Sequence, residues 1–251
     1  MIKLEHIVLP SPDQMWFVIE GMRNPMNSWD IGDSDICDDC CSDCGAEYRE
    51  CDGYPNFIED FRVGEKDYDL MRRLAKAGKD HRKYMRMMSV YVRITAPLYW
   101  WKEADTYKIG TASNSCSTMH KIHEKEFTFD DFSHEHIVCL TTLDYIIQEL
   151  NCWRSRYIQY DEDETVGINL GMSKKDIWWQ MIQLLPSSYN QTRNVMLNYE
   201  VLSNMYHSRK NHKLDEWKDF CKWIEELPLS DLITNREDET DESDNRKEDN
   251  K

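Results

Sequence analysis

Three polar residues of LLPSSYNQTRNVMLNYEVLSNMYHSR, residues 184–209, have a spacing that could form a ligand site. If the second half of this segment is a helix, Asn194, Asn198 and Arg209 project within roughly 60° of one another, at about 100° per residue. They fall in the middle of an apolar face. An amide donates and accepts hydrogen bonds at once, and a guanidinium stabilises an oxygen that gains negative charge. The pattern predicts a polar site on a buried helix face.

A structural role explains the same residues. The amides of Asn194 and Asn198 could cap neighbouring backbone, and Arg209 could pair with a carboxylate such as Glu149, because ion-pair networks are common in folded proteins. A buried guanidinium needs a partner in either case. The residue types alone leave both interpretations open.

Cysteine is concentrated in a second segment, CDDCCSDCGAEYREC, residues 37–51, which holds five of the nine cysteines. The pairs Cys37-x2-Cys40 and Cys41-x2-Cys44 have the gap with which thiolates bind zinc. Structural zinc sites usually place a second pair a dozen or more residues away, and here the nearest later cysteine, Cys51, supplies only one ligand. We interpret the cluster as reduced thiols in an acidic loop, with zinc as the alternative. We expect the scattered cysteines to be buried: Cys116, Cys139, Cys152 and Cys221.

The net charge of the chain limits the classes of partner that it can bind. The formal net charge of -16 argues against a nucleic-acid polymer, whose phosphates need a clustered basic surface, but it does not exclude a small anion. Much of the excess lies in NREDETDESDNRKEDNK, residues 235–251, which has no apolar residue and predicts a disordered acidic tail. No run of about 18 apolar residues and no signal-peptide pattern is present. We therefore expect a soluble, cytoplasmic protein with no membrane partner.

The hydrophobic pattern predicts the elements that position these residues. IKLEHIVLP, residues 2–10, indicates a strand, and residues 67–78 indicate a helix that ends at Gly78. In residues 88–97, Val90, Val92 and Ile94 alternate with outward-facing neighbours, as in a strand with one buried face. Residues 28–64 are rich in Asp, Gly and Cys and indicate a loop or insertion.

Pro97 ends the predicted strand and can begin a helix over residues 98–108, in which Trp100 and Trp101 belong to the core or stack on a ring. The polar residues 111–120 suit a binding loop. Further helices are expected over residues 141–157, 173–185 with Ser173 as N-cap, and 214–227. The fold class is α+β, a single domain over residues 1–234 with a central, mostly antiparallel sheet packed by long helices.

These residues resemble the flavin-dependent thymidylate synthases. In that family a histidine near a helix end, a strand and an Ala-Pro turn precede an RHRxxSxNExSxRY signature; a Leu-Pro and an N-x-R-x-x-x-N-x-x-x-x-R helix follow. This chain has His81, the strand, Ala96-Pro97 and TYKIGTASNSCSTMH, residues 106–120, in those places. After Leu185-Pro186, three polar residues keep the family spacing: Asn198, Asn204 and Arg209. The resemblance covers residues 66 to 225.

The signature departs from the family pattern. Its Arg-His-Arg is replaced by Thr106-Tyr107-Lys108, and Asn114 and Ser117 match only with one inserted residue. Glu200 stands where the family has the arginine of its second motif, and no arginine precedes Leu185-Pro186. The family's phosphate and flavin contacts are therefore altered, and no GxGxxG or GxxxxGK[ST] motif provides another phosphate cradle.

The resemblance implies an enzyme that methylates dUMP to dTMP, with FAD as cofactor and methylene-tetrahydrofolate and NADPH as co-substrates, in a homotetramer whose subunits share the site. Arg209 would be catalytic and contact the substrate with Ser117, and the flavin would be held by His81, Lys108, Asn114, Asn198 and Asn204. Two alternatives are a related enzyme acting on another pyrimidine nucleotide and a non-catalytic nucleotide-binding or scaffolding protein that has lost the flavin.

Overall fold

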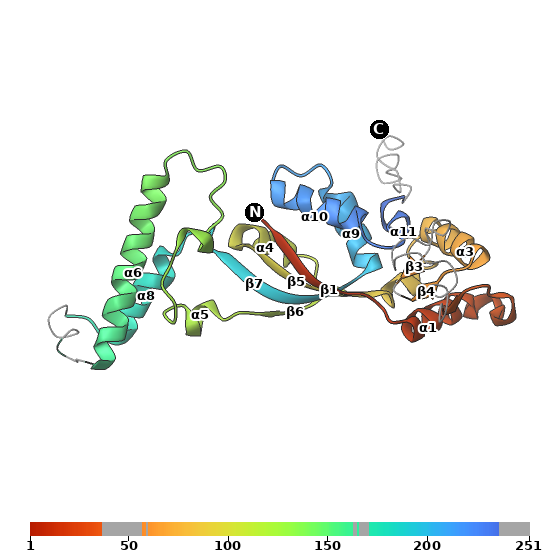
Figure 1. Cartoon of the computed structure of the whole chain (residues 1–251), viewed down its shortest axis with the longest axis horizontal. Coiled ribbons are helices and arrows are strands. Elements are labelled where there is room, and N and C mark those ends of the chain that lie inside the picture. The colour runs from red at the N-terminus through yellow and green to blue at the C-terminus, as the bar shows by residue number, and fades with distance from the viewer. Residues whose placement is uncertain (37–56, 59, 163–164, 166–170, 236–251) are drawn as a thin grey trace, which may run out of the picture. The chain divides into compact units, whose positions relative to one another are not determined.

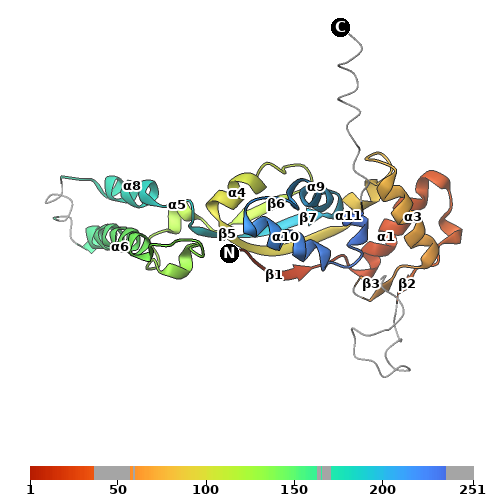
Figure 2. The ribbon, with the colours of Figure 1, turned by 90° about the horizontal axis from the view of Figure 1, so that it is seen from above.

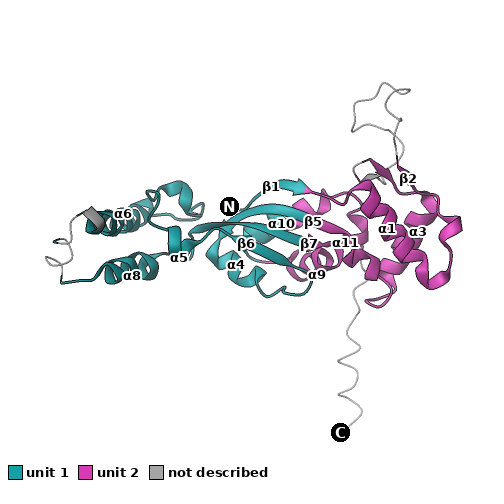
Figure 3. Ribbon diagram, turned by 90° about the horizontal axis from the view of Figure 1, so that it is seen from below, with its two compact units in different colours: residues 1–7, 91–196, 213–220 teal, residues 8–90, 197–212, 221–251 magenta. Residues whose placement is uncertain are grey.

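The structure is a computed structural model that describes residues 1–36, 57–58, 60–162, 165 and 171–235. The cysteine cluster and the acidic residues after Asn235 lie outside this part. The chain divides into two compact units (Figure 3), unit 1 with residues 1–7, 91–196 and 213–220, and unit 2 with residues 8–90, 197–212 and 221–251. Boundaries between the units fall inside three strands and one helix, which therefore contribute residues to both units. One domain over residues 1–234 stays a prediction.

A four-stranded antiparallel sheet lies mainly in unit 1, in the order β1-β5-β7-β6. Its strands are β1 (Lys3–Val8), β5 (Ser89–Pro97), β6 (Ala112–Ser115) and β7 (Asn190–Asn198). Val92, Ile94 and Ala96 of β5 are buried, whereas Tyr91 and Arg93 between them are exposed. The predicted alternation and the α+β class are confirmed.

Helix α4 (Leu98–Ala104) covers one face of the sheet (Figure 1). It begins after Pro97, as predicted, but ends at Ala104 and not at Lys108. The Trp100 ring lies 4.8 Å from the ring of Trp217 in α10 (Asp215–Glu225), and Trp101 Nε1 donates to the Gln191 carbonyl at 2.9 Å. Both α4 tryptophans are buried, so they belong to the core of unit 1.

A helical hairpin forms the second part of unit 1. Helices α6 (Leu140–Glu162) and α8 (Lys174–Leu184) lie side by side (Figure 2). Leu143, Ile147 and Met181 are among the buried residues of their shared apolar cluster. Ser173 caps α8 and exchanges hydrogen bonds with Asp176, which confirms the predicted N-cap. Two short elements, α5 (Thr118–Lys121) and η4 (Phe129–Asp131), precede the hairpin.

Unit 2 is mainly helical, with α1 (Pro12–Arg23), α3 (Glu65–Lys76), α9 (Tyr199–Arg209) and α11 (Asp231–Thr234). Short 3₁₀ segments are η1 (Asn24–Met26), η2 (Trp29–Ile31) and η3 (Lys83–Arg86). A small sheet joins β2 (Asp35–Ile36), β4 (Phe61–Arg62) and β3 (Phe57–Ile58) in that order. The described ends of residues 28–64 are thus not a plain loop, because Ile58 and Phe61 are fully buried.

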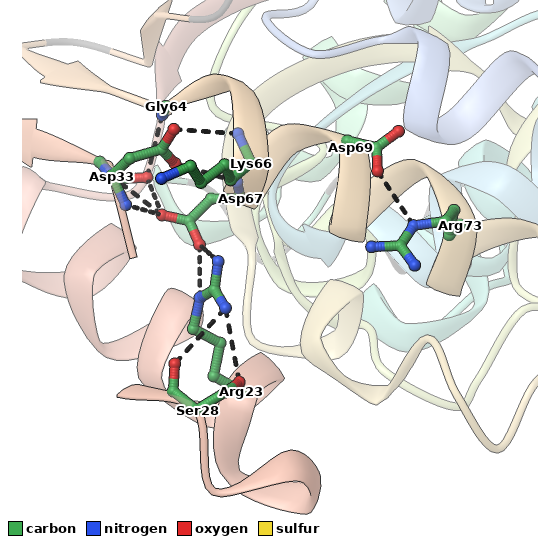
Figure 4. Close-up of polar contacts among 9 residues, drawn as sticks. Arg23, Ser28, Asp33, Gly64, Lys66, Asp67, Asp69 and Arg73 are labelled. Carbon is green, nitrogen blue, oxygen red and sulfur yellow. Dashed lines mark hydrogen bonds and ion pairs between the residues drawn. The ribbon is translucent and has the colours of Figure 1, made fainter. Parts of the chain in front are cut away.

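A buried ion pair anchors this segment to α3 (Figure 4). Arg23 Nε lies 2.5 Å from Asp67 Oδ1, and both side chains are almost completely buried. The other carboxylate oxygen of Asp67 accepts the Ser34 hydroxyl at 2.7 Å and the backbone N–H groups of Asp33 and Ser34 at 3.0 Å. A Cβ on Gly64 would lie 2.2 Å from the Asp33 carbonyl oxygen, so this approach requires glycine.

The scattered cysteines differ from their prediction. Cys221 is buried, and burial raises the pKa of its thiol to about 11. Cys116, Cys139 and Cys152 are exposed, because they lie at the ends or on the outer faces of their elements, which the residue type does not reveal. Among the described residues, no cluster of His, Cys, Asp or Glu could hold a metal ion. None of the helices described has the length and apolar composition for a membrane span.

We predict that Asp67→Asn lowers the free energy of unfolding by about 3 kcal/mol, because it leaves the buried guanidinium of Arg23 without its charge partner. Asp69→Asn is the matched control on the same helix, since Asp69 pairs with Arg73 at 3.0 Å in solvent and should matter little. Urea unfolding measures both changes. Equal effects would show that Asp67 does not anchor the segment.

Candidate functional site

The junction between β7 and α9 divides the residues that the sequence pattern placed on one helix. Asn194 lies in β7 with an exposed side chain, Asn198 is the residue before α9, and Arg209 is the last residue of α9. The predicted helix across residues 194–209 is therefore wrong at its start. Val195 and Leu197 are buried on either side of the partly buried Met196, and Asn194 before them is exposed, so the strand period applies up to Leu197.

Asn198 is the N-cap of α9. Its Oδ1 accepts the backbone N–H of Val201 at 2.9 Å, and the side chain is buried. Asparagine is a preferred N-cap because this bond satisfies a backbone donor that the first helical turn leaves open. The capping role that we left open as an alternative thus holds for Asn198.

The first turn of α9 carries a buried charge pair. Glu200 Oε2 lies 2.8 Å from Nε of Arg82, whose side chain is 2% exposed. The distance fits an ion pair, but the N–H groups at Nε and Nη2 do not point at an acceptor among the described residues. Glu200 occupies the place of an arginine in the family pattern, so Arg82 neutralises the carboxylate that this chain has there.

His81 belongs to the same neighbourhood of unit 2. It lies in the turn between α3 and η3, where Gly78 has a φ of +101°, and its N–H donates to the Gly78 carbonyl at 3.1 Å. Its side chain is exposed. The next residue is Arg82, and η3 packs on α9. The structure therefore brings the His81 turn against the start of α9, where Asn198 lies.

Asn204 and Arg209 lie farther along α9. Both are partly buried, and both have polar interactions within the chain. Arg209 is about 16 Å from Asn198 along the helix axis and at nearly the same angle around it, from 1.5 Å and 100° per residue. A ligand that contacts both residues must be extended. A cation in the last helical turn also stabilises the helix, so Arg209 has a structural role besides any ligand contact.

In unit 1, the sheet face opposite α4 is polar. Asn114 of β6 stands directly across from Asn194 of β7, and both are exposed. On the same face the hydroxyls of Thr95 and Thr192 are hydrogen-bonded at 2.8 Å, and the exposed Arg93 comes from β5. We call these residues the open sheet face. Among the described elements of unit 1, no helix covers it.

The predicted binding loop over residues 111–120 is wrong in its structure, because the segment forms strand β6 and the short helix α5. Ser117 caps α5, and its Oγ accepts the His120 N–H at 3.1 Å. Lys108 follows α4 and is exposed. Small polar residues permit a strand at a sheet edge as well as a loop, and pairing with β7 decides between them.

Of the predicted site residues, unit 1 holds Lys108, Asn114 and Ser117, and unit 2 holds His81, Asn198, Asn204 and Arg209. Sequence analysis missed Arg82 and Arg93. Arg93 follows from the alternation of β5, which predicts an outward-facing cation. No sequence pattern singled out Arg82, because residue type alone does not show whether a lysine or arginine is buried.

We predict that Arg82→Glu and Glu200→Arg each lower the free energy of unfolding by about 3 kcal/mol, because each leaves two like charges in a buried place. The double variant Arg82→Glu with Glu200→Arg should recover part of the loss. Exchanging the exposed pair Arg62 and Asp35, which lie 2.7 Å apart, is the control and should change little. Equal urea midpoints for all variants would show that the Arg82–Glu200 pair does not stabilise the fold.

The fold is that of the flavin-dependent thymidylate synthases. Thymidylate synthase X from Helicobacter pylori, solved with FAD and dUMP, matches at a TM-score of 0.57 and 14% identity, over 93% of this chain and 97% of that chain. A second structure of that enzyme with FAD and dUMP gives 0.55 and 14%, over 93% and 98%. The UMP/dUMP methylase PolB from Streptomyces cacaoi, bound with 5-Br dUMP, gives 0.52 and 10%, over 94% and 96%. No protein-family profile and no curated protein matches the sequence.

Proposed function

We propose that this chain is a dUMP-modifying enzyme of the flavin-dependent thymidylate synthase type. The fold match spans nearly the whole of both chains, and Asn198, Asn204 and Arg209 keep the family spacing along α9. The reaction would be the reductive methylation of dUMP to dTMP. Methylene-tetrahydrofolate would supply the carbon and NADPH the reducing equivalents.

The residues suit an extended ligand with a polar edge. In unit 2, the Asn204 amide and the NH₂ group of Asn198, whose Oδ1 accepts the cap bond, suit the polar edge of an isoalloxazine ring. In unit 1, Asn114 is a further amide for which we propose a flavin contact. Arg82 cancels the charge of Glu200, so the start of α9 does not repel a phosphate. FAD, when bound, supplies the redox chemistry, and the chain's own residues bind and orient.

Arg209 would act on the pyrimidine. Its guanidinium can hold a carbonyl oxygen that gains negative charge when C5 reacts, which requires a planar fork and not a point charge. Ser117 would contact the nucleotide, and Lys108 and His81 would lie on the flavin side. No covalent nucleophile of the enzyme is needed in this scheme.

A related substrate is the second candidate. The UMP/dUMP methylase PolB has the same fold, and Thr106-Tyr107-Lys108 in this chain replaces the Arg-His-Arg of the synthase signature. Such a change would alter which pyrimidine nucleotide is accepted. The same loss of cations motivates a third candidate, a nucleotide-binding protein without flavin.

We expect Arg209→Lys to keep the fold and bound flavin and to lose on the order of a hundredfold in turnover of dUMP. The wild-type protein, reconstituted with FAD, should show the flavin band at about 450 nm. Absorbance, dUMP affinity and the melting temperature of both proteins are the measurements. A lower melting temperature with unchanged dUMP affinity would make Arg209 structural, and a colourless protein that binds dUMP would favour the third candidate.

The open sheet face also supports the homotetramer that we propose. Tyr91 is 46% exposed beside Arg93, and β7 and β6 present neutral amides and hydroxyls without a covering layer in unit 1. In the proposed homotetramer a second copy of the chain would cover this face. A site shared by subunits would then include Asn114 and Asn194.

We predict that Tyr91→Glu together with Asn194→Glu reduces self-association, because two carboxylates per chain would have to be buried against a second copy. Both side chains are exposed in the single chain, so the melt should change little. Lys175→Glu at an exposed position of α8 is the control. Sedimentation at micromolar concentration should show a tetramer or dimer for the control and smaller species for the variant. A wild-type monomer would contradict the assembly.

A further inference from the structure

A strongly basic segment stands out in this acidic protein. RRLAKAGKDHRKYMR, residues 72–86, contains seven of the 31 Lys and Arg residues and only one of the 47 Asp and Glu residues. Arg82 is buried against Glu200, and the other six cations are exposed. We call these six the basic ridge: Arg72, Arg73, Lys76, Lys79, Lys83 and Arg86.

The ridge runs from the last turns of α3, past the Gly78 turn, to η3. The two elements are fixed to each other, since the hydroxyl of Tyr84 in η3 donates to the Met71 carbonyl in α3 at 2.8 Å. Beside α3 lies a groove of about 690 Å³, lined by Arg72, Arg73 and Lys76 and by Thr234 and Asn235 at the end of α11. The ridge is therefore a rigid surface with a concave end.

Charge along the ridge is only partly compensated. Two carboxylates also line the groove, where Asp231 pairs with Arg72 at 2.8 Å and Asp69 pairs with Arg73 at 3.0 Å. At the other end, Lys79, Lys83 and Arg86 have no carboxylate at ion-pair distance among the described residues. Positive potential therefore remains there.

Helix stabilisation does not explain this end of the ridge. Cations in the last turn of a helix interact favourably with its dipole, which accounts for Arg73 and Lys76 of α3. The effect fades within one turn, and Lys79, Lys83 and Arg86 lie beyond the end of α3. In a chain with a net charge of -16, a small anion is repelled by most of the surface and attracted here.

We propose that the basic ridge binds a small-molecule polyanion whose charges lie in a row, an oligocarboxylate chain. A compact phosphate needs donors that converge on one point, as in a backbone nest. Here the cations are distributed over two elements, with Lys and Arg side chains that adapt to an extended ligand. If the proposed function holds, the glutamyl chain of a polyglutamylated folate co-substrate is such a ligand. That identification rests on the proposed function, whereas the binding site does not.

The test is direct binding of penta-γ-glutamate to the full chain by calorimetry, without flavin or nucleotide. Binding should be saturable, about tenfold tighter at an ionic strength of about 0.01 M than at about 0.15 M, because the Debye length falls from about 30 Å to about 8 Å. Single glutamate and inorganic pyrophosphate should bind much more weakly. Since turnover is not measured, this result does not depend on the reaction that the chain catalyses.

Charge reversal locates the site. Lys79→Glu with Lys83→Glu should weaken penta-γ-glutamate binding about tenfold. Lys175→Glu with Lys222→Glu changes the net charge equally at exposed positions outside the ridge and should have less than about a twofold effect. Equal losses in both variants, or no binding at low ionic strength, would overturn the proposal. A five-nucleotide single strand that binds more tightly than penta-γ-glutamate would overturn the assignment to carboxylates.

Discussion

One hydrogen bond, from the Val201 N–H to the side-chain oxygen of Asn198, fixes where a strand becomes a helix. Asn198 is the last residue of β7 and the N-cap of α9, so this bond marks the point where the strand period gives way to the helical period. It also sets the angle at which Arg209 leaves the far end of α9. The Arg82–Glu200 pair holds the His81 turn to the same place. Each candidate site residue on these two elements therefore depends on this junction.

Much of the fold followed from periodicity. The alternation in β5, the apolar stripe of α3 and the Ser173 cap of α8 were predicted, because each depends on neighbours in the sequence. The core role of Trp100 was one of two interpretations, and packing against Trp217 decided it. A local sequence pattern is sufficient to predict an element whose buried face and ends are set by residues of that same element.

The candidate site residues could be selected from the sequence, but their places in strands, turns and helices could not. Asn194 and Val195 fit a helical stripe and a strand equally well, and pairing with β5 on one side and β6 on the other made this part a strand. Arg82 became buried because a carboxylate from α9, far along the chain, lies next to it. Exposure of Cys139, which precedes α6, likewise depends on the elements that pack near it. These features depend on residues far apart in the sequence, so short sequence patterns do not predict them.

The Asp67 anchor has a consequence for how this protein can diverge. Asp67 and Arg23 hold the chain before residue 37, and Ile58 and Phe61 hold it after residue 56, each by buried contacts with unit 2. The cost of closing a loop between fixed ends grows only with the logarithm of its length. The number of residues between these two anchors can therefore change at little thermodynamic penalty, and relatives of this chain can differ in length here while they keep the buried Arg23–Asp67 pair and the buried Ile58 and Phe61.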